Sequence, residues 1–113
     1  MARREKEKEK EMKSITINGT KHYFLKLKWF DICGDSTTVG DTEFNRMECA
    51  EIISEGYLYD IFEKDGREYV RTFASRQEGM DFGYGDRNVF PIEVFDKPSQ
   101  KAIREAHRAM LKG

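Results

Sequence analysis

The fold of this chain is decided by residues 50–75, which read AEIISEGYLYDIFEKDGREYVRTFAS. The stretch is rich in β-branched and aromatic residues, which favour strands over helices. Its middle holds Asp65 and Gly66, and an Asp-Gly pair between two apolar runs is typical of a tight hairpin turn. The sequence therefore predicts two antiparallel strands, residues 50–62 and 68–75, joined by this turn.

Further strands are predicted on both sides of this hairpin. Residues 14–17 and 21–33 flank a second turn pair, Asn18 and Gly19. Apolar and polar residues alternate along the start of the longer run, as they do in a half-buried strand. The last predicted strand, residues 88–95, contains a proline, which indicates a break or an edge position.

Two irregular segments separate these strands. After the second strand ends, Asp41 is expected to cap a short helix that continues through Phe44 and Met47. Residues 79–86 are rich in glycine, and we expect them to form a loop.

Length and composition limit the chain to one domain with a single modest core. It has 113 residues, of which 12% are aromatic, and aromatic side chains fill the interior of small barrels and sandwiches. Together with the strand pattern, this predicts a mainly β domain over residues 14–96, a small antiparallel barrel or sandwich. The single tryptophan, Trp29, is expected in or beside the core.

A basic amphipathic helix is predicted for residues 97–113. Pro98 lies at its start, and Ser99 is expected near its cap. The basic residues fall on one face of this helix: Lys97, Lys101, Arg104, Arg108 and Lys112. The opposite face is apolar and consists of Ile103, Ala106 and Met110.

Charge is distributed unevenly along the chain, although the net charge is only −1. Residues 1–13 are a low-complexity Lys/Glu tail, which we expect to be disordered. Residues 14–96 hold nine basic and sixteen acidic residues, and residues 97–113 hold five basic and one acidic. The basic helix face is therefore expected to contact either the acidic body or an acidic partner.

Cysteine content and hydropathy indicate a cytoplasmic protein. Cys33 and Cys49 are too few for a disulfide framework, and we expect both to be free and buried as small apolar side chains. The charged N-terminus does not look like a signal peptide, and no apolar window is long enough to span a membrane.

No catalytic residue is predicted. Gly34, Asp35 and Ser36 resemble the nucleophile motif of GDS-type esterases, but those enzymes have an Asp three residues before their His, where this chain has Arg104 before His107. The chain is also too short for the α/β fold of that family.

Metals and cofactors are not predicted either. The two histidines, His22 and His107, have no ligand partners at metal-binding spacing. Asp35 and Asp86 each follow a glycine at a strand boundary, so we expect their carboxylates to bond to backbone groups of turns.

An aromatic groove is a second candidate feature. Six rings could form a stacking platform for single-stranded nucleic acid: Tyr57, Tyr59, Tyr69, Phe73, Phe82 and Tyr84. The acidic charge around them opposes phosphate binding, so we favour core packing with one exposed groove.

Three stretches together resemble small, uncharacterised proteins encoded by bacteriophages. They are residues 29–36 (WFDICGDS), 54–59 (SEGYLY) and 85–91 (GDRNVFP), and the likeness covers residues 23–95. That family has no assigned activity, so the resemblance implies a phage-encoded accessory protein and transfers no site. The Phe-Pro pair before the last strand is also similar to the end of an SH3-like barrel. This likeness implies a small, five-stranded, SH3-like antiparallel barrel followed by the C-terminal amphipathic helix.

We therefore expect a non-enzymatic binding module that binds a protein partner, from the host or the phage, in the host cytoplasm. The residues expected to contact the partner are Lys101, Arg104, Arg108, Lys112, Tyr57, Tyr59 and Tyr84. The alternative is a nucleic-acid-binding module that uses the basic helix and the N-terminal tail. An enzyme or a protein that sequesters a small molecule is a third possibility. No cofactor, metal, membrane contact or small-molecule substrate is predicted.

Overall fold

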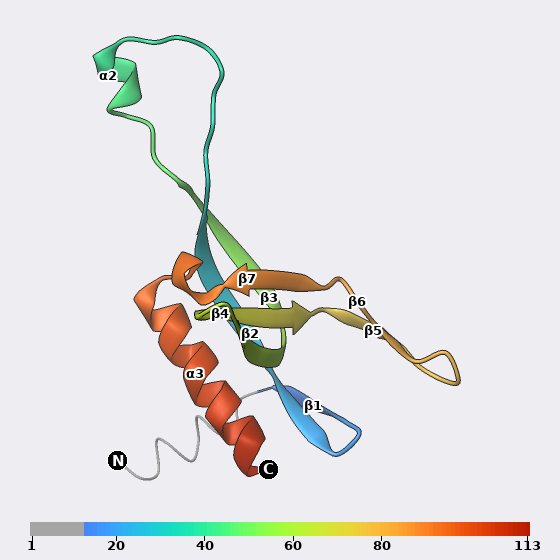
Figure 1. The fold of residues 1–113 in the computed structure, drawn as a ribbon. Helices are drawn as coiled ribbons and strands as arrows, with labels where there is room; N and C mark the ends of the chain where they lie inside the picture. Colours follow the sequence, from blue (N-terminus) through green and yellow to red (C-terminus); the bar gives the residue numbers. More distant parts are fainter. Residues whose placement is uncertain (1–12) are drawn as a thin grey trace.

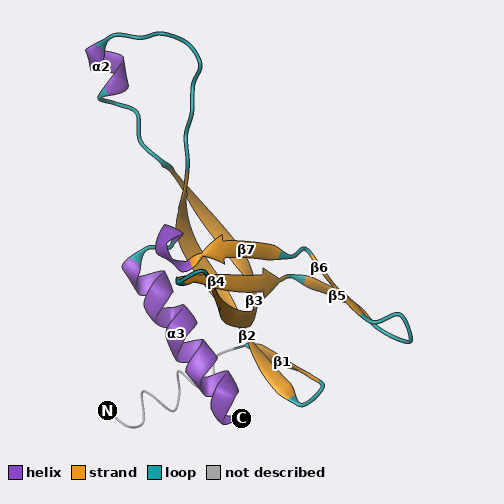
Figure 2. Cartoon of the chain, viewed as in Figure 1, coloured by secondary structure: helices purple, strands orange, loops and turns teal. Residues whose placement is uncertain are grey.

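A computed structural model describes residues 13–113 as a five-stranded antiparallel sheet, a two-stranded ribbon and a C-terminal helix (Figures 1 and 2). The strand order of the sheet is β1-β2-β3-β4-β7. These strands are β1 (Ser14–Ile17), β2 (Thr20–Asp31), β3 (Ala50–Lys64), β4 (Arg67–Phe73) and β7 (Asn88–Pro91). The ribbon consists of β5 (Ser75–Gln77) and β6 (Gly83–Gly85). The helices are α2 (Asp41–Phe44), the 3₁₀ helix η1 (Ile92–Val94) and α3 (Lys97–Lys112). The predicted disordered tail falls almost wholly outside the described residues.

Both predicted hairpin turns are confirmed. Asp65 and Gly66 have φ angles of 54° and 78°, and Asn18 and Gly19 have φ angles of 49° and 81°. Two successive left-handed residues form the turn whose twist matches that of the flanking strands, which is why Asn-Gly and Asp-Gly are favoured there. The turns fix the pairing of β3 with β4 and of β1 with β2.

The mainly β architecture with a C-terminal helix is confirmed, but the strands form an open sheet rather than a closed barrel. β7 pairs with β4 and ends at Pro91, after which η1 turns the chain. Beyond η1, strand pairing with β2 is limited to a single bridge between Trp29 and Phe95, and the amide of Asp96 donates to the carbonyl of Lys28 at 3.0 Å. Proline has no N–H group to donate to a strand ladder, so β7 ends at Pro91, before the chain reaches β2.

The core lies between one face of the sheet and α3. Its buried apolar residues are Leu25, Leu27, Leu58, Val70, Phe90, Ile92, Phe95, Ile103 and Ala106. The apolar face predicted for the helix therefore packs on the sheet, and Met110 packs against the same core. Trp29 is partly buried beside it, as predicted, with its ring 5.3 Å from that of Phe90 and its Nε1 donating to Ser54 Oγ at 2.9 Å.

The start of α3 is tied to the sheet by two side chains. Asp96 is the N-cap, and its carboxylate accepts a hydrogen bond from the amide of Ser99 at 2.8 Å. The hydroxyl of Ser99 in turn accepts from the amide of Lys28 in β2 at 2.9 Å. Ser99 lies near the cap, as predicted, and its hydroxyl also links the first turn of the helix to β2.

Several local predictions are wrong. The loop predicted for residues 79–86 contains β6, which pairs with β5, and the last strand stops at Pro91 rather than at residue 95. Gly40, not Asp41, is the N-cap of α2. Cys33 and Cys49 are exposed rather than buried, because they lie at the two ends of a projecting loop that nothing covers.

Truncating the central core residue should destabilise the protein strongly. Leu58 is fully buried, so Leu58→Ala should lower the free energy of unfolding by about 2–5 kcal/mol, as is usual for Leu→Ala in a core. Ile53 lies on the same strand and is 50% exposed, so Ile53→Ala should cost less than about 1 kcal/mol. Urea denaturation of the two variants measures both values, and equal losses would contradict the assigned core.

Gly56 should resist even a methyl group. A Cβ at this position would lie 3.1 Å from the backbone oxygen of Phe73, so Gly56→Ala should cost about 1–3 kcal/mol through overpacking. A Cβ on Gly34 would meet nothing within 4 Å, so Gly34→Ala should be neutral or slightly stabilising. Thermal denaturation of both variants compares the two glycines, and a neutral Gly56→Ala would show that β3 and β4 are not this close.

Candidate functional site

The residues predicted to contact a partner are divided between two faces of the sheet. Successive side chains of a strand point to opposite faces. Leu58 faces α3, so its neighbour Tyr57, paired across the sheet with Phe24 and Phe73, faces away. The structure therefore does not bring the predicted tyrosines together with the predicted basic residues of α3.

The aromatic side chains form a second, smaller core around Phe73, which is 2% exposed. Its ring centroid lies 4.8 Å from Tyr84, 5.5 Å from His22, 5.6 Å from Tyr57 and 6.3 Å from Tyr59. Tyr84 comes from β6, so the β5–β6 ribbon completes this cluster. Burial raises the pKa of the Tyr84 hydroxyl.

His22 is a structural member of this cluster. It is buried, stacks on Tyr59 at 5.9 Å, and its Nδ1 lies 2.8 Å from the carbonyl oxygen of Leu58. An imidazole N–H that donates to a backbone carbonyl fixes the orientation of the ring. The ring therefore fills space between strands.

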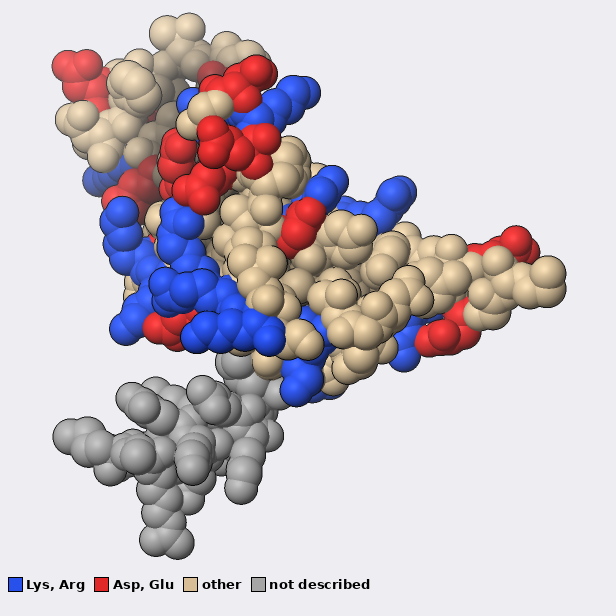
Figure 3. All heavy atoms as spheres, turned by 60° about the horizontal axis from the view of Figure 1, so that its bottom comes forward, with Lys and Arg blue, Asp and Glu red and all other residues tan. Residues whose placement is uncertain are grey.

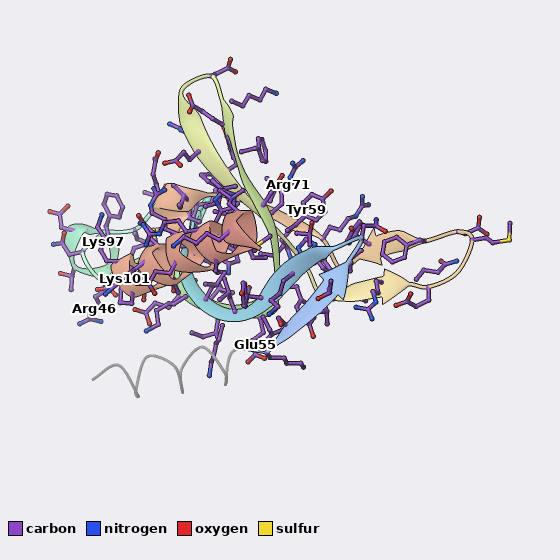
Figure 4. All side chains as sticks on the ribbon, turned by 90° about the horizontal axis from the view of Figure 1, so that it is seen from below. Arg46, Glu55, Tyr59, Arg71, Lys97 and Lys101 are labelled. Carbon is purple, nitrogen blue, oxygen red and sulfur yellow. The ribbon has the colours of Figure 1, made fainter. Side chains whose placement is uncertain are left out.

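The exposed edge of the cluster is occupied by a cation. The guanidinium carbon of Arg71 lies 5.4 Å from the Tyr59 ring and 4.4 Å from the Phe62 ring (Figure 4). Asp60 holds this guanidinium through two hydrogen bonds, one of them 2.7 Å long, and thereby raises the pKa of Arg71. Because the rings face one another and Arg71, few ring faces are free to stack on nucleic-acid bases.

The basic residues of α3 form the other surface. Figure 3 shows Lys and Arg side chains gathered over α3, with Asp and Glu side chains next to them over the β3–β4 hairpin. We define the basic face as Lys97, Lys101, Arg104, Arg108 and Lys112. Every member except Arg104 is exposed.

Arg104 is bound by the body of the protein. Its Nη1 and Nη2 donate to the two carboxylate oxygens of Glu68 in β4, at 3.2 and 3.0 Å. This hydrogen-bonded pair lowers the pKa of Glu68 and raises that of Arg104. One basic residue of the face thus helps to dock the helix, while the others point to solvent.

A hollow lies where α3 meets the β3–β4 hairpin, with a volume of about 290 Å³. It is lined by Ile61, Phe62, Glu63, Glu68, Arg104, His107 and Arg108. Arg104 and Arg108 lie beside Glu63 and Glu68 there, so the hollow presents both charge signs rather than one. Its Arg108 side continues into the basic face.

The loop with the Gly-Asp-Ser motif has the structure of a turn. The Asp35 carboxylate accepts hydrogen bonds from the amide and the hydroxyl of Thr37 at 2.8 and 2.7 Å, which lowers the pKa of Asp35. The turn role predicted for Asp35 is confirmed. Ser36 is exposed on this loop, whereas His107 lies on α3. Asp86 occupies a left-handed turn position, with a φ of 49°. Among residues 13–113 its carboxylate accepts no hydrogen bond, so the side-chain role predicted for Asp86 is not confirmed.

Residues 13–113 contain no group of three or more His, Cys, Asp or Glu residues placed to hold a metal ion. Within the same residues, no helix is long and apolar enough to cross a membrane.

A projecting loop, residues 32–49, is a feature that the sequence analysis missed. Every residue of it is exposed, including Ile32 at 90% and Phe44 at 66%. The interval between the strands predicted at residues 21–33 and 50–62 is long, and its apolar residues follow neither a helical nor a strand period. That combination is the signal that could have identified it.

The pair of Glu68 and Arg104 should make stability depend on acid pH. The hydrogen bonds from Arg104 lower the pKa of Glu68 below its usual value of 4.5. The contribution of the pair to the free energy of unfolding is therefore complete above that pH and is lost as the pH falls through the lowered pKa. Glu68→Gln removes this titration, so its unfolding free energy should fall less steeply with acid than that of the wild type. Urea denaturation across the acid range measures the slopes, and equal slopes for Glu68→Gln and the wild type would contradict a contribution of this pair to stability.

The described residues thus hold one packed aromatic cluster, one exposed basic face and one projecting loop. The guanidinium of Arg71 covers part of the cluster, whereas the loop and the basic face, apart from Arg104, are exposed to solvent. Comparisons of the chain with protein-family models, with curated proteins and with solved structures give no match.

Proposed function

We propose that this chain is a non-enzymatic binding module that recognises an acidic protein surface through the basic face of α3. One observation carries the proposal. The helix is anchored by its apolar face, with Ile103 and Ala106 fully buried, while Lys97, Lys101, Arg108 and Lys112 are exposed.

The helix is held rigidly enough to present these charges. The Asp96 cap, the bond from Lys28 to Ser99 and the Arg104–Glu68 pair fix α3 at its start and middle. A surface that is already ordered loses less conformational entropy on binding. Basic side chains in fixed array also speed the encounter with an acidic partner.

The neighbouring charge favours a protein over nucleic acid. Glu63 and Glu68 of the β3–β4 hairpin line a hollow together with Arg104 and Arg108. Figure 3 shows acidic side chains over this hairpin next to the basic side chains over α3. These carboxylates would repel the continuous line of phosphates of a nucleic acid bound along α3. A protein surface with separate acidic groups can instead contact the basic face and avoid the hairpin.

The biological setting and the finer fold belong to the same proposal. The resemblance of residues 29–36, 54–59 and 85–91 to phage-encoded proteins supports a phage accessory protein that acts in the host cytoplasm. The return of Phe95 and Asp96 to β2 supports an SH3-like path of the strands. Tyr57, Tyr59 and Tyr84 lie on the other sheet face, so we do not assign them to the same partner contact.

Charge reversal on α3 tests this function. The triple variant Lys101→Glu, Arg108→Glu, Lys112→Glu should bind a fluorescent oligoglutamate peptide at least about tenfold more weakly than the wild type. Three exposed pairs of about 0.5 kcal/mol each account for a factor of that size. Fluorescence anisotropy measures binding, and wild-type affinity should fall as salt rises.

The matched control reverses three exposed basic residues elsewhere: Lys21→Glu, Lys64→Glu and Arg87→Glu. It should bind the peptide about as well as the wild type, and so should Tyr59→Ala. If the control bound the peptide as weakly as the helix variant does, net charge alone would explain the effect, and the basic face would not be a specific site. Tighter binding of single-stranded or duplex DNA than of the peptide would favour the nucleic-acid alternative.

A further inference from the structure

The projecting loop exposes apolar side chains that its own chain does not cover. Ile32, Val39, Phe44 and Met47 are 90%, 46%, 66% and 38% exposed. Exposed apolar side chains gathered in one segment are typical of protein contact sites. Three of them, Val39, Phe44 and Met47, line a hollow of about 560 Å³ together with Cys33, Asp35 and Glu43.

The charge of this loop is opposite to that of the basic face. Residues 32–49 contain four acidic residues, Asp35, Asp41, Glu43 and Glu48, and one basic residue. All four are exposed, so they surround the apolar side chains with negative charge.

The basic face has an apolar residue of its own. Leu111 is 74% exposed and follows Arg104 and Arg108 by seven and three residues, which puts it on the same side of the helix. The two surfaces are therefore complementary in both charge and chemistry: acidic with exposed Phe and Met on the loop, basic with exposed Leu on the helix.

One molecule does not bring these surfaces together. Figure 1 shows the loop with α2 at one end of the molecule and the C-terminal end of α3 at the other. The longest extent of the molecule is 55 Å. A second molecule can supply the missing surface.

We propose that the projecting loop of one copy binds the basic face of α3 of a second copy. This inference rests on the proposed function and names its acidic partner as the chain itself. A twofold arrangement forms the contact twice, because each copy contributes one loop and one helix, and it closes a dimer.

A charge-swap experiment tests the dimer. The helix variant reverses Lys101, Arg108 and Lys112 to Glu, and the loop variant reverses Asp41, Glu43 and Glu48 to Lys. Each variant alone puts like charges on both surfaces and should be monomeric in sedimentation velocity at concentrations where the wild type dimerises. An equimolar mixture restores opposite charges at both contacts and should form a heterodimer.

Two further variants complete the test. Phe44→Ser removes apolar contact without changing charge and should weaken wild-type dimerisation at least about fivefold. The variant of Lys21, Lys64 and Arg87 carries the same charge change as the helix variant and should still dimerise. All substituted residues are exposed, so each variant should fold, and circular dichroism is the measurement that checks this.

The outcomes separate this inference from the proposed function. A wild type that stays monomeric, or a mixture that stays monomeric while the wild type dimerises, overturns the self-association. If oligoglutamate still binds the wild type and not the helix variant, the basic face remains a site for a different acidic protein. If the helix variant binds oligoglutamate as well as the wild type does, the proposed function itself is wrong.

Discussion

The pairing of β3 with two different strands is the constraint on which the rest of the structure depends. Its first half pairs with β2 and its second half with β4, and the register shifts between Leu58 and Asp60. The bulge leaves Tyr59 out of the ladder and bends the sheet. The same strand therefore supplies Leu58 to the core under α3 and Tyr57 to the aromatic cluster on the other face.

The elements set by local chemistry could be predicted from the sequence. Asn18-Gly19 and Asp65-Gly66 specify their turns because few other residues tolerate two left-handed positions. The burial of Ile103 and Ala106 follows from the helical period. The open edge of the sheet could not be predicted, because it depends on where η1 directs the chain after Pro91.

The site was harder to predict than the fold, since it depends on contacts between distant residues. Residue spacing places Arg104 on the basic face with Arg108, yet only the structure shows that Glu68 binds it. The number of tyrosines can be read from the sequence and predicts an aromatic groove. Their packing against Phe73 can be read only from the structure. Free cysteines are generally buried, which is why burial was the natural prediction. Cys33 and Cys49 are exposed because their loop projects away from the sheet (Figure 2).

The separation of the projecting loop from both cores has an evolutionary consequence. Residues 32–49 contribute no buried side chain, so substitutions there cost the folded state little. Surface loops on a stable scaffold tolerate change in sequence and length far better than the strands that hold them. Natural selection can therefore replace the exposed side chains of this loop step by step, while the β2–β3 pairing and the helix anchor stay as they are.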